Sequence, residues 1–227
     1  LHMWLVAVYQ SVWTGVSLYV STAPKLAAFG FWLKWQPIVH VAGDRSVAPF
    51  AFLSLLTGAV NALAQPLMKP LLAYSAVGMN GILLMAIHAA ENGAFWVNLI
   101  VYLWTMTLAW PLLSDLNLVS LTDRFRAFGW ALVAISLAGL PPLVGFVGKG
   151  MVFWHSLGHP ALLAVALFST GLSLVYYLYS LLLAYRAEGG PLLVKDSHST
   201  RVTLVSYGLS ALCWASQPLL LACAVLG

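Results

Sequence analysis

The chain has very few charged residues for its length. Only 7% of its 227 residues are Asp, Glu, Lys or Arg, whereas 62% are hydrophobic and the mean hydropathy is +0.92. A water-soluble domain needs far more polar surface, so this composition excludes a soluble globular protein. The net charge of +4 therefore does not indicate a nucleic-acid partner, because in a membrane protein it reports the asymmetry of the loops.

Cysteine is almost absent as well. Cys213 and Cys223 lie ten positions apart in one apolar run, which on a helix places them about 15 Å apart and excludes a disulfide. No Cys or His spacing is typical of a zinc, haem or iron–sulfur site, and there is no GxGxxG fingerprint. We expect this chain to bind no metal and no redox cofactor.

Long apolar runs are abundant, and they predict the fold. We expect an all-α, polytopic transmembrane bundle of about seven helices in a single domain, residues 1–227. The expected helices are 12–35, 46–66, 68–90, 93–113, 127–156, 160–185 and 201–226. Basic residues gather on the face of the N-terminus, which places the N-terminus on the matrix or cytoplasmic side and the C-terminus on the opposite side.

The expected helix 127–156 is too long for one straight crossing. It contains Gly139, Pro141, Pro142 and Gly145, and the paired prolines remove two N–H donors. These residues predict a break at Gly139–Pro142, and discontinuous helices are where transporters place ion sites. The alternative is a simple proline kink.

Two lysines fall deep inside expected helices. Lys149 follows the break among apolar residues, and Lys25 lies near the middle of 12–35. A lysine at membrane depth costs about 2.5 to 3.5 kcal/mol on insertion scales, so such residues mark ion or proton pathways unless they snorkel to an interface. Both lysines are candidates to release and regain a proton.

Other polar residues carry weaker signals. Lys69 begins the expected third helix and serves equally as an orientation signal or a pathway residue, while Lys34 is typical of an interfacial anchor. His88 and Glu91 end the third helix, where solvent exposure explains them, although His88 titrates near neutral pH and could relay protons. Intramembrane Ser, Thr and Asn residues either form a water wire or hydrogen-bond neighbouring helices: Ser21, Thr22, Ser54, Thr57, Asn61, Ser75, Asn80, Ser169 and Thr170.

The run from Ser136 to Lys149, SLAGLPPLVGFVGK, closely resembles the broken-helix signature of subunit 2 of respiratory complex I, an antiporter-like, proton-translocating subunit of NADH:ubiquinone oxidoreductase. Two further stretches agree in order, residues 2–25 and 69–75. The resemblance implies that Lys25 and Lys149 are the central and terminal lysines of a proton pathway. It also implies that NADH, FMN, iron–sulfur clusters and ubiquinone bind other subunits of the complex.

The chain departs from the family pattern at several positions. Val6-Ala7 replaces an expected Pro-Asp or Pro-Glu pair, Met79 replaces a histidine, and Pro70 replaces a basic residue. These changes favour, to some extent, a structural remnant that no longer conducts protons. A subunit of a cation/proton antiporter or of a membrane-bound hydrogenase is the other alternative.

The resemblance covers only the C-terminal half of the family protein. It implies that the partners are other membrane-arm subunits, membrane lipids, and a separate polypeptide that supplies the N-terminal half. We expect the mitochondrial inner membrane as the location, with a bacterial plasma membrane or a plastid thylakoid as alternatives.

Overall fold

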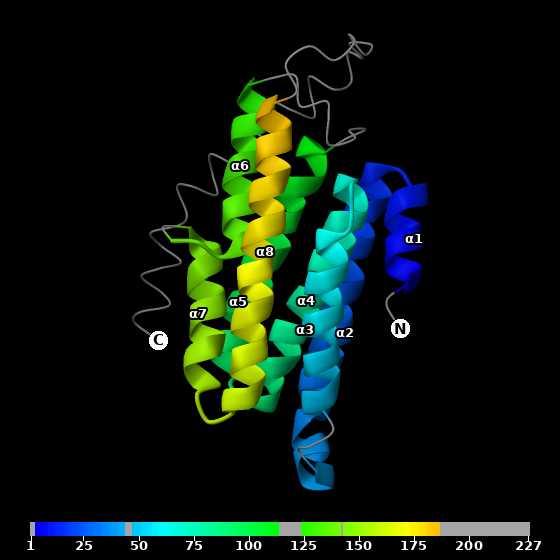
Figure 1. Cartoon of the computed structure of the whole chain (residues 1–227). Helices are drawn as coiled ribbons and strands as arrows, with labels where there is room; N and C mark the ends of the chain where they lie inside the picture. The colour runs from blue at the N-terminus through cyan, green and yellow to red at the C-terminus, as the bar shows by residue number, and fades with distance from the viewer. Residues whose placement is uncertain (1–2, 44–46, 114–123, 142, 187–227) are drawn as a thin grey trace.

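The computed structural model describes residues 3–43, 47–113, 124–141 and 143–186, and the regular structure in these ranges is entirely helical. The helices are α1 (Met3–Ser11), α2 (Thr14–Gly43), α3 (Val47–Leu63), α4 (Met68–His88), α5 (Asn92–Leu112), α6 (Arg124–Ala138), α7 (Val144–His155) and α8 (Pro160–Arg186). They run alongside one another as a bundle (Figure 1). The predicted all-α fold is confirmed.

The helices differ from the prediction in number and in bounds, and the largest shift of an end is in α2, which continues to Gly43 instead of ending at residue 35. Residues 3–11 form a separate helix, α1, which the sequence did not suggest because nine residues are too few to cross a bilayer. The segment 127–156 forms two helices, α6 and α7, so the predicted break is present. The predicted helix 201–226, with Cys213 and Cys223, lies outside the described residues.

Helix α4 forms the centre of the bundle, since it packs against α1, α3, α5, α7 and α8. Its closest neighbour is α3, because small residues let the two backbones meet. A Cβ atom added at Gly58 of α3 would collide with the backbone of Gly78 in α4, and one added at Gly81 would lie 2.9 Å from the backbone nitrogen of Leu55. Close contact through small residues is the usual way in which membrane helices associate.

The surface of the bundle is apolar and its interior is partly polar. Large hydrophobic side chains such as Trp13, Phe31, Phe168 and Leu182 are exposed, while Lys149 and several serines are buried. Within the described ranges, three helices are long and apolar enough to cross a membrane: Met68–His88, Asn92–Leu112 and Pro160–Leu182. This distribution is the one expected of a bundle whose solvent is lipid.

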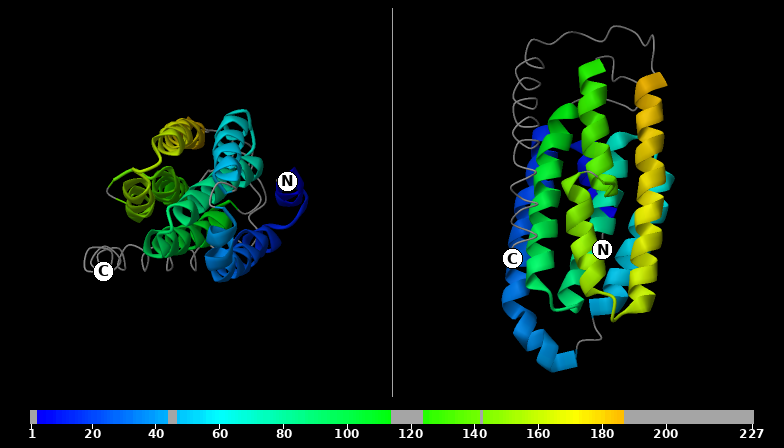
Figure 2. Two further views of the ribbon diagram at one scale, coloured as in Figure 1. Left: turned by 90° about the horizontal axis from the view of Figure 1, so that it is seen from below. Right: turned by 90° about the vertical axis from the view of Figure 1, so that its left-hand side faces the viewer.

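Helices α6 and α7 follow one another along a common direction, with the break part-way along the bundle (Figures 1 and 2). Helix α7 packs against α5, and α6 packs against both α5 and α8. The end of α6 therefore lies inside the bundle, where its backbone carbonyls have to find donors within the protein.

Candidate functional site

The C-terminus of α6 is closed by a Schellman motif centred on Gly139. Gly139 has a φ of +82°, and its N–H bonds to the carbonyl of Ser136 at 3.1 Å. The N–H of Leu140 bonds to the carbonyl of Ile135 at 3.2 Å. This pair of bonds satisfies two of the last carbonyls of α6. Those of Leu137 and Ala138 accept no backbone hydrogen bond from the residues that the structure describes.

Lys149 supplies the missing donors. Its Nζ atom donates to the carbonyl of Leu137 at 2.6 Å and to that of Ala138 at 3.1 Å. The residue is only 7% exposed. A helix C-terminus carries partial negative charge, so the broken helix gives this buried ammonium both its hydrogen bonds and a favourable field.

Glycines allow α7 to approach this point. A Cβ atom at Gly145 would collide with the carbonyl oxygen of Ser136, and one at Gly148 would lie 2.9 Å from Oδ1 of Asn98. A Cβ atom at Gly139 would lie 2.8 Å from Cδ of Lys149. The glycines of the sequence motif thus bring Lys149 onto the end of α6.

A polar cavity adjoins Lys149. It offers about 30 Å³ to the centres of water molecules, and Lys149 is the only charged residue among the described residues that line it. The polar residues in its wall are Ser75, Asn98, Tyr102, Thr105, Ser136, Ser169, Thr170, Ser173 and Tyr176. Since a water molecule needs roughly 10 to 15 Å³ measured in this way, the cavity has room for about two.

The sequence had indicated Ser75, Ser169 and Thr170 as polar residues within the helices, but not the other polar residues of the cavity wall. Six of its residues lie on two helices with the same spacing of four and then three positions: Asn98, Tyr102 and Thr105 on α5, and Ser169, Ser173 and Tyr176 on α8. That spacing places polar side chains on one face of a helix. The signal was present in the sequence, but only the structure shows that the two polar faces meet.

Other polar side chains predicted from the sequence hydrogen-bond within the protein and are not among the residues that line the cavity. Ser21 accepts a hydrogen bond from Nε1 of Trp110 at 2.9 Å, and Thr22 bonds to its own helix. Of the cavity residues, Ser75 shares a 2.5 Å bond with the hydroxyl of Tyr177, and Ser169 donates to the carbonyl of Leu55 at 3.2 Å. Hydrogen bonding between helices is therefore confirmed for Ser21, Ser75 and Ser169, while the water wire stays a prediction for the residues that line the cavity.

Lys25 lies on α2 against α4 and α5. Its Nζ atom is 3.9 Å from the centroid of the Tyr102 ring and donates to the carbonyl of Ala76 at 3.4 Å. The side chain is half-buried, which agrees with a position on the side of α2 that faces its neighbours. Tyr102 thus contacts one lysine and shares a cavity with the other.

Lys69 and His88 do not join this site. They lie at opposite ends of α4, 19 residues apart, which corresponds to about 28 Å along a helix. Lys69 donates to the carbonyl of Val12, just after α1, at 3.5 Å. The ring of His88 lies 4.4 Å from that of His159, between centroids.

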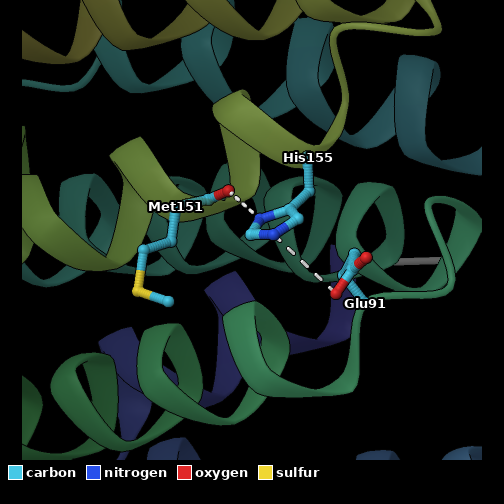
Figure 3. Close-up of polar contacts among 3 residues, drawn as sticks. All are labelled: Glu91, Met151 and His155. Atoms are coloured by element: carbon cyan, nitrogen blue, oxygen red, sulfur yellow. Dashed lines mark hydrogen bonds and ion pairs between the residues drawn. The ribbon is translucent and has the colours of Figure 1, made fainter. Parts of the chain in front are cut away.

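The end of the bundle that holds His88 carries a small titratable cluster: His88, Glu91, His155 and His159. Nε2 of His155 lies 3.8 Å from the Glu91 carboxylate, and its Nδ1 is 2.8 Å from the carbonyl of Met151 (Figure 3). His155 and His159 are exposed, as expected of a solvated turn. Lys34, the expected interfacial anchor, is exposed on α2.

Comparison with known proteins agrees with this geometry. The sequence model described as "NADH:quinone oxidoreductase/Mrp antiporter, TM" matches residues 1–174. The chain belongs to this family. The match includes the broken helix, Lys25 and Lys149, and the resemblance identified from the motifs is confirmed.

Relatives of this antiporter-like family member include subunits of NADH dehydrogenases. The chain is 44% identical to NADH-ubiquinone oxidoreductase chain 2 of Chlamydomonas reinhardtii, over 78% of this chain and 43% of that protein. It is 36% identical to NADH-quinone oxidoreductase subunit N of Gluconacetobacter diazotrophicus, over 69% of this chain and 37% of that protein.

A solved structure shares the fold. A chain of respiratory complex I from Thermus thermophilus, with bound aureothin, superposes with a TM-score of 0.76 at 30% identity, covering 93% of this chain and 52% of that chain. The chain spans about half the length of these relatives. The antiporter-like fold is therefore shown for the part of the chain that the structure describes.

Proposed function

We propose that this chain is part of the antiporter-like membrane subunit, subunit 2, of respiratory complex I, and that Lys149 and Lys25 carry protons across the membrane. The observation that carries this proposal is Lys149 itself, 7% exposed, hydrogen-bonded to two carbonyls of a broken helix and facing a polar cavity. The relatives, which are chains of NADH-ubiquinone and NADH-quinone oxidoreductases, support the same assignment.

The contacts of Lys149 suit a group that changes its protonation state in place. A protonated lysine has three N–H donors, two of which the carbonyls of Leu137 and Ala138 accept. The third is left for water in the cavity. After the proton leaves, the neutral amine still has two N–H groups for the same two carbonyls, and its lone pair takes the place of the third donor. Protonation and deprotonation thus need no rearrangement of the broken helix.

In this proposal Lys25 exchanges protons with Lys149 across α5, which Lys25 contacts at Tyr102. Its charge is stabilised by the Ala76 carbonyl and by the face of the Tyr102 ring. When one lysine is protonated, its field disfavours protonation of the other, so successive loading and release can move charge along the bundle. Electron transfer would take place elsewhere, with NADH, FMN, iron–sulfur clusters and ubiquinone in the other subunits.

The cluster of His88, Glu91, His155 and His159 forms the water-accessible end of this proton pathway. The rings of His88 and His159 lie 4.4 Å apart, between centroids, near the Glu91–His155 pair, and an imidazole can both accept and donate a proton. Lys69, at the other end of α4, ties the turn after α1 to the bundle through Val12. We assign the relay role to His88, and to Lys69 a structural role at the opposite face.

We propose that this subunit lies in the mitochondrial inner membrane, with the turn between α1 and α2, and not Met3 at the start of α1, on the matrix face. The support is the excess of basic residues expected on the face that holds Lys69. Asn92 and Ala64 are both exposed, at opposite ends of the bundle, and serve as reporters. In intact mitoplasts an impermeant maleimide should label Asn92→Cys and not Ala64→Cys; the reverse pattern would invert the orientation.

We further propose that this chain assembles with other membrane-arm subunits of the complex, as the similar chain in the solved structure of respiratory complex I does. Half-buried Lys25 and the exposed aromatic residues of α2, such as Tyr19 and Phe31, offer a surface for a neighbouring part of the complex. Native gel electrophoresis of gently solubilised membranes, stained for NADH oxidation and followed by mass spectrometry, tests both assignments. Co-migration of this chain with the activity and with other membrane-arm subunits is the expected result. Migration apart from the activity would move the assignment to a cation/proton antiporter.

The proton-carrying role needs a separate test. Lys149→Met removes the titratable group, and Lys34→Met removes an exposed lysine at no proposed step. In assembled complex, NADH-driven proton uptake into vesicles should slow at least about tenfold with Lys149→Met, since loss of a carrier raises the barrier by more than 1.4 kcal/mol, and should stay unchanged with Lys34→Met. Normal uptake by the Lys149→Met variant would identify the chain as a structural element of the membrane arm.

A further inference from the structure

Tyr102 contacts Lys25 and lies in the wall of the cavity beside Lys149. It lies on α5, is 2% exposed, and presents the face of its ring to Nζ of Lys25 at 3.9 Å. It also lines the cavity that Lys149 lines. Among the described residues, it is thus in contact with one lysine and in a shared cavity with the second.

The hydroxyl of Tyr102 is buried and has no hydrogen-bond partner within the described part of the chain. A buried polar group left unpaired costs about 1 to 3 kcal/mol, so native proteins satisfy such groups with other residues or with water. The Nδ2 atom of Asn98, one turn earlier on α5 and also in the cavity wall, is buried and unpartnered in the same way. Two orphaned groups in the wall of one cavity indicate that it holds water.

The size of the cavity agrees with that conclusion. Its volume of about 30 Å³ has room for about two water molecules. The wall provides the hydroxyls of Ser136, Ser173 and Thr105 in addition to the two unpartnered groups. A water in this site can therefore make the two to four hydrogen bonds that hold a buried water in place.

We propose that Tyr102 is the proton relay between Lys25 and Lys149, an inference that rests on the function proposed above. The ring positions the ammonium of Lys25, and the hydroxyl connects to cavity water. The ammonium of Lys25 gives a proton, through water, to a lone pair of Tyr102 Oη. The O–H proton of Tyr102 passes to cavity water, and that water gives a proton to the neutral amine of Lys149. Tyr102 ends the step as it began, Lys25 is neutral and Lys149 is charged.

The ring and the hydroxyl of Tyr102 make separate contributions to the proposed relay, and two substitutions distinguish these contributions. Tyr102→Phe keeps the ring beneath Lys25 and removes only the hydroxyl, whereas Tyr102→Leu removes both. Tyr9→Phe is the matched control, because Tyr9 is 1% exposed, packs edge-on against Trp110 and is not in the cavity wall. All three variants are compared in the assembled complex, with assembly checked on native gels stained for NADH oxidation.

The measurement is NADH-driven proton uptake into vesicles, in water and in deuterium oxide. Tyr102→Phe should lower the rate of uptake at least about tenfold, as for a lost relay group. It should also change the solvent isotope effect, which loss of packing alone would leave unaltered. Tyr102→Leu should be slower still, and Tyr9→Phe should match the parent in both solvents.

The outcomes separate this inference from the proposed function. Slow uptake by Lys149→Met together with normal uptake and a normal isotope effect in Tyr102→Phe would overturn the relay and leave the lysine pathway intact. Normal uptake by Lys149→Met would overturn the pathway itself. Slow uptake by Tyr102→Phe with an unaltered isotope effect would reduce Tyr102 to a packing role and contradict the relay.

Discussion

The side chain of Lys149 occupies the space that a side chain at Gly139 would need. A Cβ atom at Gly139 would lie 2.8 Å from Cδ and 3.5 Å from Nζ of Lys149. Gly139 also has a φ of +82°, in the left-handed region that other L-residues adopt at a cost of about 1 to 2 kcal/mol. The residue that ends α6 and the lysine that caps it therefore constrain each other.

Gly139→Ala should destabilise the subunit by about 1 to 3 kcal/mol, through left-handed strain and contact with Lys149. Because the lysine has to move, NADH-driven proton uptake should fall as well. Gly150→Ala is the control, since nothing lies within 4 Å of its added Cβ atom, and it should be neutral or slightly stabilising. Thermal unfolding of the complex and proton uptake check both variants. Equal unfolding midpoints and equal proton uptake in the two variants would contradict the close contact between Gly139 and Lys149.

A Schellman motif also ends α4, but there the left-handed position is occupied by alanine instead of glycine. Ala90 has a φ of 58°, its N–H bonds to the carbonyl of Ile87 at 3.0 Å, and that of Glu91 bonds to Ala86 at 3.2 Å. Glycine removes the left-handed strain at such a position, so Ala90→Gly should stabilise the subunit by about 1 kcal/mol. A lowered midpoint of thermal unfolding would show that the alanine conformation is not strained.

The contact between α3 and α4 gives a third prediction. Gly58→Ala places a methyl group against the backbone of Gly78 and should cost about 1 to 3 kcal/mol, because two backbones have to separate. Gly78→Ala meets only the Cα atom of Gly58, at 4.0 Å, and should be tolerated. The yield of assembled complex on native gels compares the two. If Gly58→Ala assembles as well as Gly78→Ala, the helices are less closely packed than described.

The histidine cluster at the end of α4 gives a fourth prediction. His88→Leu should slow proton uptake several-fold, since it removes the group assigned to the relay. Glu91→Gln should change stability by less than about 1 kcal/mol, because the Glu91 and His155 side chains are 45% and 34% exposed and such ion pairs are weak. Proton uptake and thermal unfolding are measured for both variants. Uptake by His88→Leu equal to that of the parent would remove His88 from the pathway.

Much of the broken helix could be predicted from the sequence. Pro141 and Pro142 prevent a regular helix wherever they occur, and Gly139 favours a left-handed helix end, so the break follows from local backbone chemistry. The depth of Lys149 followed from its position among apolar residues. These inferences depend only on residues that are close together in the sequence.

The rest of the site depends on contacts between helices. The spacing of Asn98, Tyr102 and Thr105 gave α5 a polar face, but the sequence does not state that this face meets Ser173 on α8. The contact of Lys25 with Tyr102 joins residues 77 positions apart. Helix α1 was not predicted, because a helix of nine residues is marginal by itself and is stabilised here by packing against α4.

The central claim is that Lys149 changes its protonation state during turnover, and the proton-to-electron ratio of two variants tests it most directly. Lys149→Arg keeps a charged donor for the carbonyls of Leu137 and Ala138 but cannot release a proton, whereas Lys149→Met removes charge and donors together. Both are measured in assembled complex beside Lys34→Met. We expect a lowered ratio with both Lys149 variants and the parental ratio with Lys34→Met. A parental ratio in Lys149→Arg would show that Lys149 serves only as a fixed charge at the end of α6.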